Sequence, residues 1–161
     1  IGYINSSSSS LADNVKVQNC SIQGLNIEFS VTKVTNIRVG GLIGYIHMYG
    51  GVELHLNNSF VQNLIINANV TSISGVGGII GYKEHSVNER IKPGTPYFYI
   101  ENCYSTGKIN TMNHAGGILG YGLYGNTYIR YCYSMVNITS NVTSGNAYIG
   151  GIVGYSGTES S

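Results

Sequence analysis

The feature that most constrains this chain is a hexapeptide that occurs four times. Its pattern is Gly-Gly-aliphatic-aliphatic-Gly-Tyr, and the four copies read GGLIGY, GGIIGY, GGILGY and GGIVGY. They begin at Gly40, Gly77, Gly116 and Gly150, so successive starts lie 37, 39 and 34 residues apart. Self-similarity at such a period is typical of tandem arrays in which each repeat stacks on the next. The hexapeptide therefore predicts a tandem array of stacked repeats.

A second motif lies upstream of each hexapeptide and follows the pattern aliphatic-x-Asn-Cys. Ser59 replaces the cysteine once, and Tyr131 replaces the asparagine once. The four equivalent positions are Cys20, Ser59, Cys103 and Cys132. In a stack of repeats they form an inward row of small side chains, because a free cysteine packs as a small hydrophobe. One disulfide plus one thiol, or a reactive thiol, remains an alternative for the three cysteines.

Short alternating stretches lie between the two motifs, and β-branched and aromatic residues dominate the chain. Each repeat reads as about three strands separated by Gly, Asn and Ser turns. We expect an all-β fold, a parallel β-solenoid of about four coils with roughly three short strands per coil. In this interpretation the hexapeptide is a strand, and its tyrosine stacks on its equivalents at the inter-strand spacing of about 4.8 Å. The resulting row comprises Tyr45, Tyr82, Tyr121 and Tyr155.

The repeats also define the expected domain organisation. Residues 15–156 form the repeat array, residues 1–14 a flexible Ser-rich lead-in and residues 157–161 a tail, with repeats ending near 45, 82, 121 and 155. Two longer linkers, 47–55 and 83–97, separate a hexapeptide from the next Asn-Cys motif. We expect 83–97 to protrude as an exposed loop, which fits a tolerated insertion better than the partner contacts that such loops often carry. Because no end caps are visible, we expect a fragment of a longer array.

The four hexapeptides, with the Asn-Cys-Tyr-Ser-Thr-Gly segment from Asn102 to Gly107, resemble GLUG-motif repeats. The resemblance covers about residues 15–156, with Ser59 and the unequal repeat lengths as departures. It implies a repeat region of a large secreted or surface protein, such as a bacterial adhesin, a region flanking an immunoglobulin-cleaving metallopeptidase or a protist surface protein. It implies no catalysis by the repeats, because enzymes that carry them have their active sites in other domains.

Charge is scarce and evenly balanced. Charged residues make up 9% of the chain, against about 25% in ordinary soluble domains. The formal net charge is +1 and the Lys and Arg residues form no run, so we expect no nucleic-acid partner. No apolar stretch approaches the ~20 residues of a membrane span, so none is expected. A surface of neutral Asn, Ser, Thr and Tyr side chains favours a secreted, extracellular or cell-surface protein.

No pattern in the chain predicts catalysis. None of the seven Asp and Glu residues pair at i,i+2, and none recur at one repeat position, whereas glycosidase chemistry needs paired carboxylates. Glu53 and His55 would share a strand face near His47, but a metal site needs three or four convergent ligands. We therefore expect no enzyme, no metal and no cofactor, and we expect Glu53 and His55 to form an exposed hydrogen-bonded pair.

Asn-x-Ser/Thr sequons suggest a second class of site. In a eukaryotic secretory protein they mark surface positions for glycans, whereas in a bacterial protein they are polar turn residues. Asn19 is the least suited, because it adjoins the cysteine row. The candidate N-glycosylation sites are Asn69, Asn137, Asn141, Asn57 and Asn5.

The expected function is a non-catalytic structural or adhesive repeat region, serving as a building block of a filament. An open end of the stack exposes unpaired strand backbone, so we expect end-to-end self-association or pairing with neighbouring repeats. The alternative is a carbohydrate-binding module that recognises glycans through exposed Tyr and Asn rows. Host or cell-surface proteins are further candidate partners.

Overall fold

The computed structural model describes residues 1–6, 14–29, 37–49, 51–68, 73–86, 96–112, 114–142 and 146–157. Throughout these ranges the regular elements are β-strands, with no helix. The strands pair in parallel in all four sheets. The prediction of an all-β chain with parallel strands is confirmed.

The four sheets are here named A to D. Sheet A runs in the order β1 (Tyr3–Ser6), β6 (Ile43–Tyr49), β10 (Ile80–Ser86), β14 (Leu119–Leu123) and β18 (Val153–Gly157). Sheet B runs in the order β2 (Asn14–Gln18), β7 (Glu53–Asn57), β11 (Pro96–Glu101) and β15 (Asn126–Arg130). Sheet C contains β3 (Ser21–Gln23), β8 (Phe60–Ala68), β12 (Tyr104–Thr111) and β16 (Tyr133–Ser140), and β4 (Asn26–Glu28) also pairs with β8. Sheet D contains β5 (Ile37–Gly40), β9 (Ile73–Gly77), β13 (Ala115–Gly116) and β17 (Ile149–Gly150).

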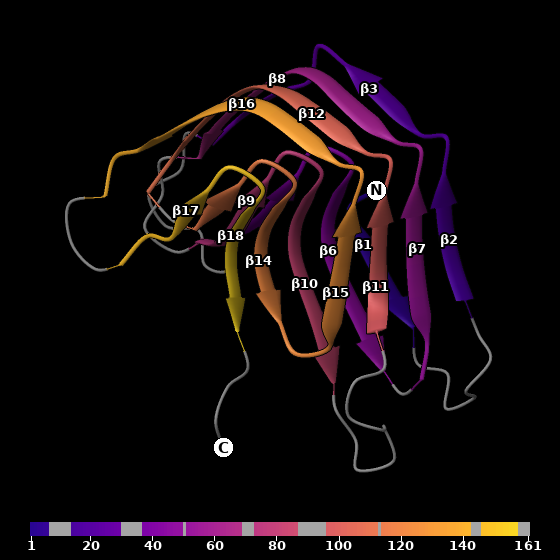
Figure 1. Ribbon diagram of the computed structural model, residues 1–161. Coiled ribbons are helices and arrows are strands. Elements are labelled where there is room, and N and C mark those ends of the chain that lie inside the picture. The colour runs from indigo at the N-terminus through magenta and orange to yellow at the C-terminus, as the bar shows by residue number, and fades with distance from the viewer. Residues whose placement is uncertain are drawn as a thin grey trace.

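Successive segments of the chain each supply strands to all four sheets. We name these segments the first repeat (β2 to β6), the second (β7 to β10), the third (β11 to β14) and the fourth (β15 to β18). Strand β1 lies beyond the first repeat, as a fifth strand of sheet A (Figure 1). The expectation of roughly three strands per repeat is therefore too low, because the strands of sheet D were not anticipated.

The hexapeptide is a turn between sheets D and A, so the expectation that it lies in a single strand is wrong. Gly40 ends β5 and Ile43 begins β6, and a Cβ atom at Gly40 would lie 2.0 Å from the carbonyl oxygen of Ile43. The same approach recurs in the later repeats, at 1.8, 2.1 and 1.8 Å. Only glycine tolerates backbone this close to its Cα.

The second glycine of each hexapeptide lets successive turns stack directly. A Cβ atom at Gly41 would lie 2.2 Å from the carbonyl oxygen of Gly78, and one at Gly78 would lie 2.0 Å from that of Gly117. At Gly151, in the fourth repeat, a Cβ atom would meet nothing within 4 Å. Glycine is therefore required at this position wherever another repeat lies on top.

Inward side chains of neighbouring repeats pack on one another. In sheet C, Ile27, Ile66, Ile109 and Ile138 are register partners and form one row. Ile66 and Ile109, in the middle repeats, are fully buried, whereas Ile27 and Ile138 at the two ends are half-buried. Because a fully buried side chain of this size contributes about 1.5–3 kcal/mol, the middle repeats carry most of the hydrophobic stabilisation.

Three segments differ from the expected boundaries. Tyr3–Ser6, expected within the flexible lead-in, forms β1 and pairs with β6. The expected linker 47–55 is mostly strand, since β6 runs to Tyr49 and β7 begins at Glu53. The expected loop 83–97 begins inside β10 and ends inside β11, and its residues 87–95 lie outside the described part of the chain. Pairing with adjacent repeats extends these strands beyond what local patterns indicate.

The stacking of turns predicts a large difference between two glycine substitutions. Gly78→Ala is expected to lower the free energy of unfolding by about 3 kcal/mol or more, because the new methyl group meets backbone that cannot move aside. Gly151→Ala is the matched control, with an expected change within about 0.5 kcal/mol. Urea unfolding followed by circular dichroism measures both. Equal losses in the two variants would contradict direct stacking of the turns.

Candidate functional site

Tyrosine side chains form a continuous row on the face of sheet A that is turned toward sheet D. The members are register partners in adjacent strands, and they are Tyr3, Tyr45, Tyr82, Tyr121 and Tyr155. Centroids of successive rings lie 4.9, 5.4, 5.1 and 4.5 Å apart. Three of these contacts are stacked, whereas Tyr45 and Tyr82 meet edge-on at 68°. Most ring faces in the row are therefore covered by a neighbouring ring.

Arg38 of sheet D occupies the irregular step in this row. Its guanidinium carbon lies 3.8 Å from the ring centroid of Tyr45 and 4.6 Å from that of Tyr82, which is cation–π geometry. The Tyr45 hydroxyl donates a hydrogen bond of 2.8 Å to the Glu84 carboxylate. Burial and this hydrogen bond raise the pKa of Tyr45 above its ordinary value, so the hydroxyl stays a donor at neutral pH. The network joins the first repeat to the second.

Two further aromatic rows lie on the outer faces of sheets B and C. On sheet B the centroids of His55 and Tyr99 are 4.5 Å apart and those of Tyr99 and Tyr128 are 5.9 Å apart. On sheet C, Phe60, Tyr104 and Tyr133 are spaced at 4.8 and 4.9 Å, with planes within 6° of parallel. Rings stacked in this way cover one another's faces and present their edges to solvent. The end rings of each described row keep one face without an aromatic neighbour. Tyr128 and Tyr133 are the last rings, and the first rings, His55 and Phe60, have Lys16 and Ser21 as register partners in the first repeat.

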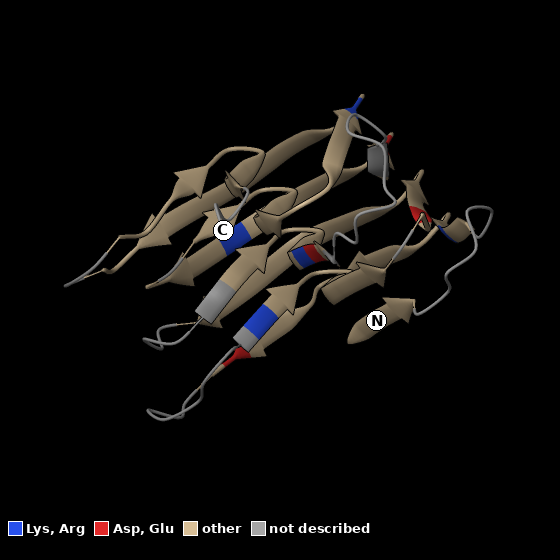
Figure 2. Cartoon of the chain, turned by 90° about the horizontal axis from the view of Figure 1, so that it is seen from below, with Lys and Arg blue, Asp and Glu red and all other residues tan. Residues whose placement is uncertain are grey.

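Charged groups on these sheets are isolated from others of the same sign. Figure 2 shows Lys, Arg, Asp and Glu at scattered positions among uncharged strands. Glu101 and Arg130 are register partners in sheet B and form an ion pair, with a hydrogen bond of 2.8 Å from Arg130 Nε. On sheet C the Asn110 amide donates to the Asn67 side-chain oxygen at 2.7 Å. The outer surface is therefore built mainly from neutral hydrogen-bonding groups.

The predicted row of small side chains lies at the corner between sheets B and C. Each member donates its thiol or hydroxyl to the carbonyl oxygen two residues earlier, and the bonds are Cys20 to Gln18 at 3.4 Å, Ser59 to Asn57 at 2.8 Å, Cys103 to Glu101 at 3.1 Å and Cys132 to Arg130 at 3.2 Å. All three cysteines are free thiols. Hydrogen bonding with Cys132, together with burial, raises the pKa of Cys103. The same hydrogen bond lowers the pKa of Cys132 to about 7. Cys103 is a poor nucleophile, because a protonated thiol reacts slowly, and every member of the row holds a backbone carbonyl in place.

The residue before each member of the corner row has a left-handed backbone. The φ angles of Asn19, Asn58 and Asn102 are 56°, 50° and 52°, and that of Tyr131 is 54°. Asn tolerates this region far better than other non-glycine residues. The corner geometry thus explains the Asn of the Asn-Cys motif. Tyr131 is the strained exception, and its side chain is 81% exposed.

Lys83 is the least expected feature of the interior. Its register partners are Ile46 in the first repeat and Gly122 in the third, so it belongs to an inward row. Only 2% of its surface is exposed. A Cβ atom at Gly122 would lie 2.9 Å from Lys83 Cε, so the glycine leaves the space that the lysine side chain occupies.

The ammonium group of Lys83 is held by backbone carbonyls of the turn between β14 and β15. Lys83 Nζ donates to the carbonyl oxygen of Tyr124 and, at 2.9 Å, to that of Gly125. It also lies 4.6 Å from the ring centroid of Phe98. Burial lowers the pKa of Lys83 from 10.5 to about 7, because an interior of low polarity disfavours the charged form. The expectation that Lys83 begins an exposed loop is therefore wrong, because its side chain is buried.

The residues considered as metal ligands do not converge. His55 Nε2 and Glu53 Oε2 lie 3.2 Å apart, as a partly buried pair. Across the described residues no three His, Cys, Asp or Glu side chains are grouped as metal ligands would be. The same residues contain no helix that could cross a membrane.

The candidate glycosylation sites occupy different environments. Asn137 and Asn141 are exposed, within and just after β16, and Asn5 is exposed on β1. The side-chain oxygen of Asn57 is buried. Asn69 lies outside the described residues.

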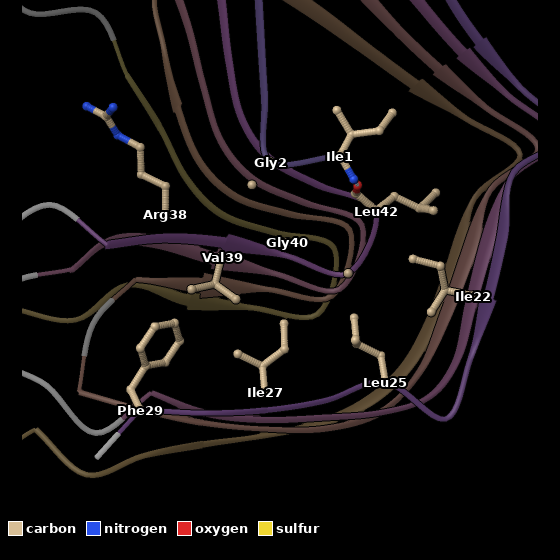
Figure 3. A pocket seen from close by; sticks show the side chains of 12 residues that line it. Ile1, Gly2, Ile22, Leu25, Ile27, Phe29, Arg38, Val39, Gly40 and Leu42 are labelled. Carbon is tan, nitrogen blue, oxygen red and sulfur yellow. Dashed lines mark hydrogen bonds between the residues drawn. The ribbon is translucent and has the colours of Figure 1, made fainter. Parts of the chain in front are cut away.

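A hollow of about 380 Å³ opens at the free end of the first repeat (Figure 3). Its lining is mainly apolar and includes Ile22, Leu25, Ile27, Phe29, Val39 and Leu42, together with the charged side chain of Arg38. The backbone of Ile1 and Gly2 borders it, because β1 is, among the described residues, the strand that lies beyond the first repeat. A signal for β1 was present in the sequence, since Ile1-Gly2-Tyr3 repeats the second half of the hexapeptide.

Comparison of the chain with protein-family models, with curated proteins and with solved structures finds no match. The resemblance to GLUG-motif repeats therefore rests on the motifs in the sequence. Inference about function rests on those motifs and on the geometry described above.

The strained corner predicts that one exposed substitution stabilises the protein. Tyr131→Asn is expected to raise the free energy of unfolding by about 1 kcal/mol, because Asn accepts positive φ more readily than Tyr. Tyr131→Ala is the control: it removes the ring and keeps an unfavourable backbone, so its expected change is within about 0.5 kcal/mol. Thermal and urea unfolding report the difference. If alanine stabilised as much as asparagine, the ring rather than the backbone would be responsible.

Lys83 predicts a pH-dependent stability. Between pH 7 and 10.5 the unfolded chain binds a proton at Lys83 that the folded chain lacks, so stability rises with pH by up to about 1.4 kcal/mol per pH unit. This stability is lost progressively as the pH falls from 10.5 to about 7, below which Lys83 is protonated in both the folded and the unfolded chain. Lys83→Met is expected to remove that slope in urea unfolding measured from pH 6.5 to 10. Lys108→Met, at an exposed position, should follow the wild type; an unchanged slope in Lys83→Met would contradict the assignment.

Proposed function

We propose that this chain is a parallel β-solenoid of four windings, and that it serves as a non-catalytic structural or adhesive region of a secreted or cell-surface protein. Each repeat corresponds to one winding. The resemblance of the repeated motifs to GLUG-motif repeats supports this assignment, as does the scarcity of charge. The neutral outer rows also suit an extracellular protein whose surface does not depend on ion pairs.

One observation carries the proposal: the side chains that recur in every repeat are engaged in packing and hydrogen bonds within the stack. The tyrosines of sheet A contact one another, the corner thiols and hydroxyl bind nearby carbonyls, and the glycines accommodate the next turn. A motif conserved from repeat to repeat for packing leaves few groups free to act on a substrate. The role that fits such side chains is to maintain the shape of a long, regular stack.

The same rows weaken the carbohydrate-binding alternative. Aromatic residues bind sugars through their ring faces, whereas the rings of Tyr99 and Tyr104 are stacked between neighbours on both sides. Binding along the outer faces would therefore have to use ring edges and Asn side chains alone. The rings at the ends of the rows each keep one face without an aromatic neighbour. Those of Tyr128 and Tyr133 lie at one end of the stack, whereas those of His55 and Phe60 face their register partners Lys16 and Ser21.

A glycan-array screen, combined with unfolding of a ring variant, tests the proposal. The wild-type chain is expected to bind no glycan, and Tyr104→Ala is expected to lose about 1–2 kcal/mol of stability, because its ring stacks on both Phe60 and Tyr133. Lys108→Ala, an exposed position on the same strand of sheet C, is the control, with an expected change within about 0.5 kcal/mol. Specific binding of a glycan that Tyr104→Ala abolished while the fold persisted would replace the structural function with the carbohydrate-binding one.

A further inference from the structure

The two ends of the stack expose the same inward rows. Among the described residues, the half-buried apolar side chains that pack against the core lie in β1, in the first repeat and in the fourth repeat. Toward the first end they are Ile4, Val15, Cys20, Ile22, Leu25, Ile27 and Phe29. Toward the last end they are Ile129, Cys132, Val136, Ile138, Ile152 and Val153. Each end therefore lacks the layer of side chains that covers the middle repeats.

Register decides how these two ends would fit each other. Leu25 and Val136 belong to one inward row, and Ile27 and Ile138 belong to the next. If the fourth repeat of a second copy lay against the first repeat, Val136 would cover Leu25 and Ile138 would cover Ile27. Aliphatic groups would then fill the 380 Å³ hollow, as the second repeat fills the equivalent space in the middle of the stack.

The outer rows are compatible with the same contact. Continuing the rows of sheet B would set Lys16 beside the uncovered face of Tyr128, a cation–π arrangement. In the same way Arg130 would meet Gln18, a neutral partner. On sheet C, Glu28 would meet Thr139. No two charges of one sign would face each other in these rows, and like charges directly opposite would be destabilising.

Strand β1 occupies the place that β18 of the second copy would take. Tyr3 stacks on Tyr45 with ring centroids 4.9 Å apart, and the Tyr45 amide donates to the Gly2 carbonyl oxygen at 3.1 Å. The sequence of β18 around Tyr155 is Val-Gly-Tyr, equivalent to Ile1-Gly2-Tyr3. Strand β18 can therefore reproduce the contacts of β1 with β6, while the rest of the fourth repeat adds pairing in sheets B, C and D that β1 cannot supply.

We propose that the hollow of the first repeat binds the fourth repeat of a second copy of this chain, head to tail, with β18 of that copy replacing β1 beside β6. This arrangement deepens the proposed structural function and rests on it. However many copies have joined, one end of the assembly still has an open hollow and the other end an uncovered fourth repeat, so association continues into a filament. Displacement of β1 is the step that separates the monomer from the assembled form.

Sedimentation velocity on the full chain over a range of concentrations tests the head-to-tail contact. The wild type is expected to form dimers and longer species as concentration rises. Ile27→Arg blocks the first end and Ile138→Arg blocks the last end, so each variant alone is expected to remain monomeric. An equimolar mixture of the two is expected to stop at a 1:1 dimer, because each variant retains one intact end.

Two results would overturn the contact: a wild-type chain that remains monomeric at every concentration, or a mixture of folded variants that forms no heterodimer. Circular dichroism shows whether each variant is folded. If a variant does not fold, the concentration series of the wild type alone tests the head-to-tail contact.

A second variant tests strand replacement. Ile4→Asn weakens the packing of β1 on the core, so it is expected to tighten association about tenfold, the opposite of an ordinary interface mutation. Asn5→Ala, on the exposed side of the same strand, is the control and should leave the dissociation constant unchanged. Weaker or unchanged association of Ile4→Asn would overturn the replacement of β1.

These outcomes are separate from those of the glycan array. A monomeric wild type that binds no glycan would overturn the filament and leave the structural function in place. Glycan binding that depends on Tyr104 would overturn the structural function whether or not chains associate.

Discussion

Parallel hydrogen bonding in register determines which side chains are neighbours throughout this molecule. Residues one repeat apart lie opposite each other, so a residue at a given position must be compatible with the equivalents of itself on either side. Amides and aromatic rings meet this condition, as Asn67 with Asn110 and Phe60 with Tyr104 illustrate. A row of identical ions would not, because like charges would repeat at about 4.8 Å. The few ions present have unlike partners, such as Glu101 with Arg130. The low charge of the chain is thus a consequence of its register.

The hexapeptide turn adds a second constraint, on volume. Its first glycine allows the chain to pass from sheet D to sheet A within a few residues, and its second allows turns to lie directly above one another. The tightness of this turn brings Arg38 of sheet D over the tyrosines of sheet A. The aromatic row and the glycine turn are therefore one structural unit, which explains why Gly and Tyr recur together in every copy of the motif.

The sequence was sufficient to predict the features that recur, and insufficient for those that depend on a single repeat. Parallel strands, the alignment of Tyr45 with Tyr82 and the position of Cys103 follow from repetition alone. Sheet D was missed because its strands are two to five residues long and end in the glycine of the turn, so no alternation is visible. The burial of Lys83 was missed because it depends on Gly122, a small residue one repeat away that no local pattern links to it.

Lys83 and Gly122 also bear on how such an array could lengthen. Tandem genes commonly grow by duplication of one unit, which would place a copy of the second repeat directly upon itself. A lysine would then lie where Gly122 now leaves room. Two ammonium groups would be buried side by side, and the carbonyl oxygens of Tyr124 and Gly125 could bind only one of them. The second repeat is thus bound to its successor as a pair, and duplication of this part of the gene would be tolerated only if both units were copied together.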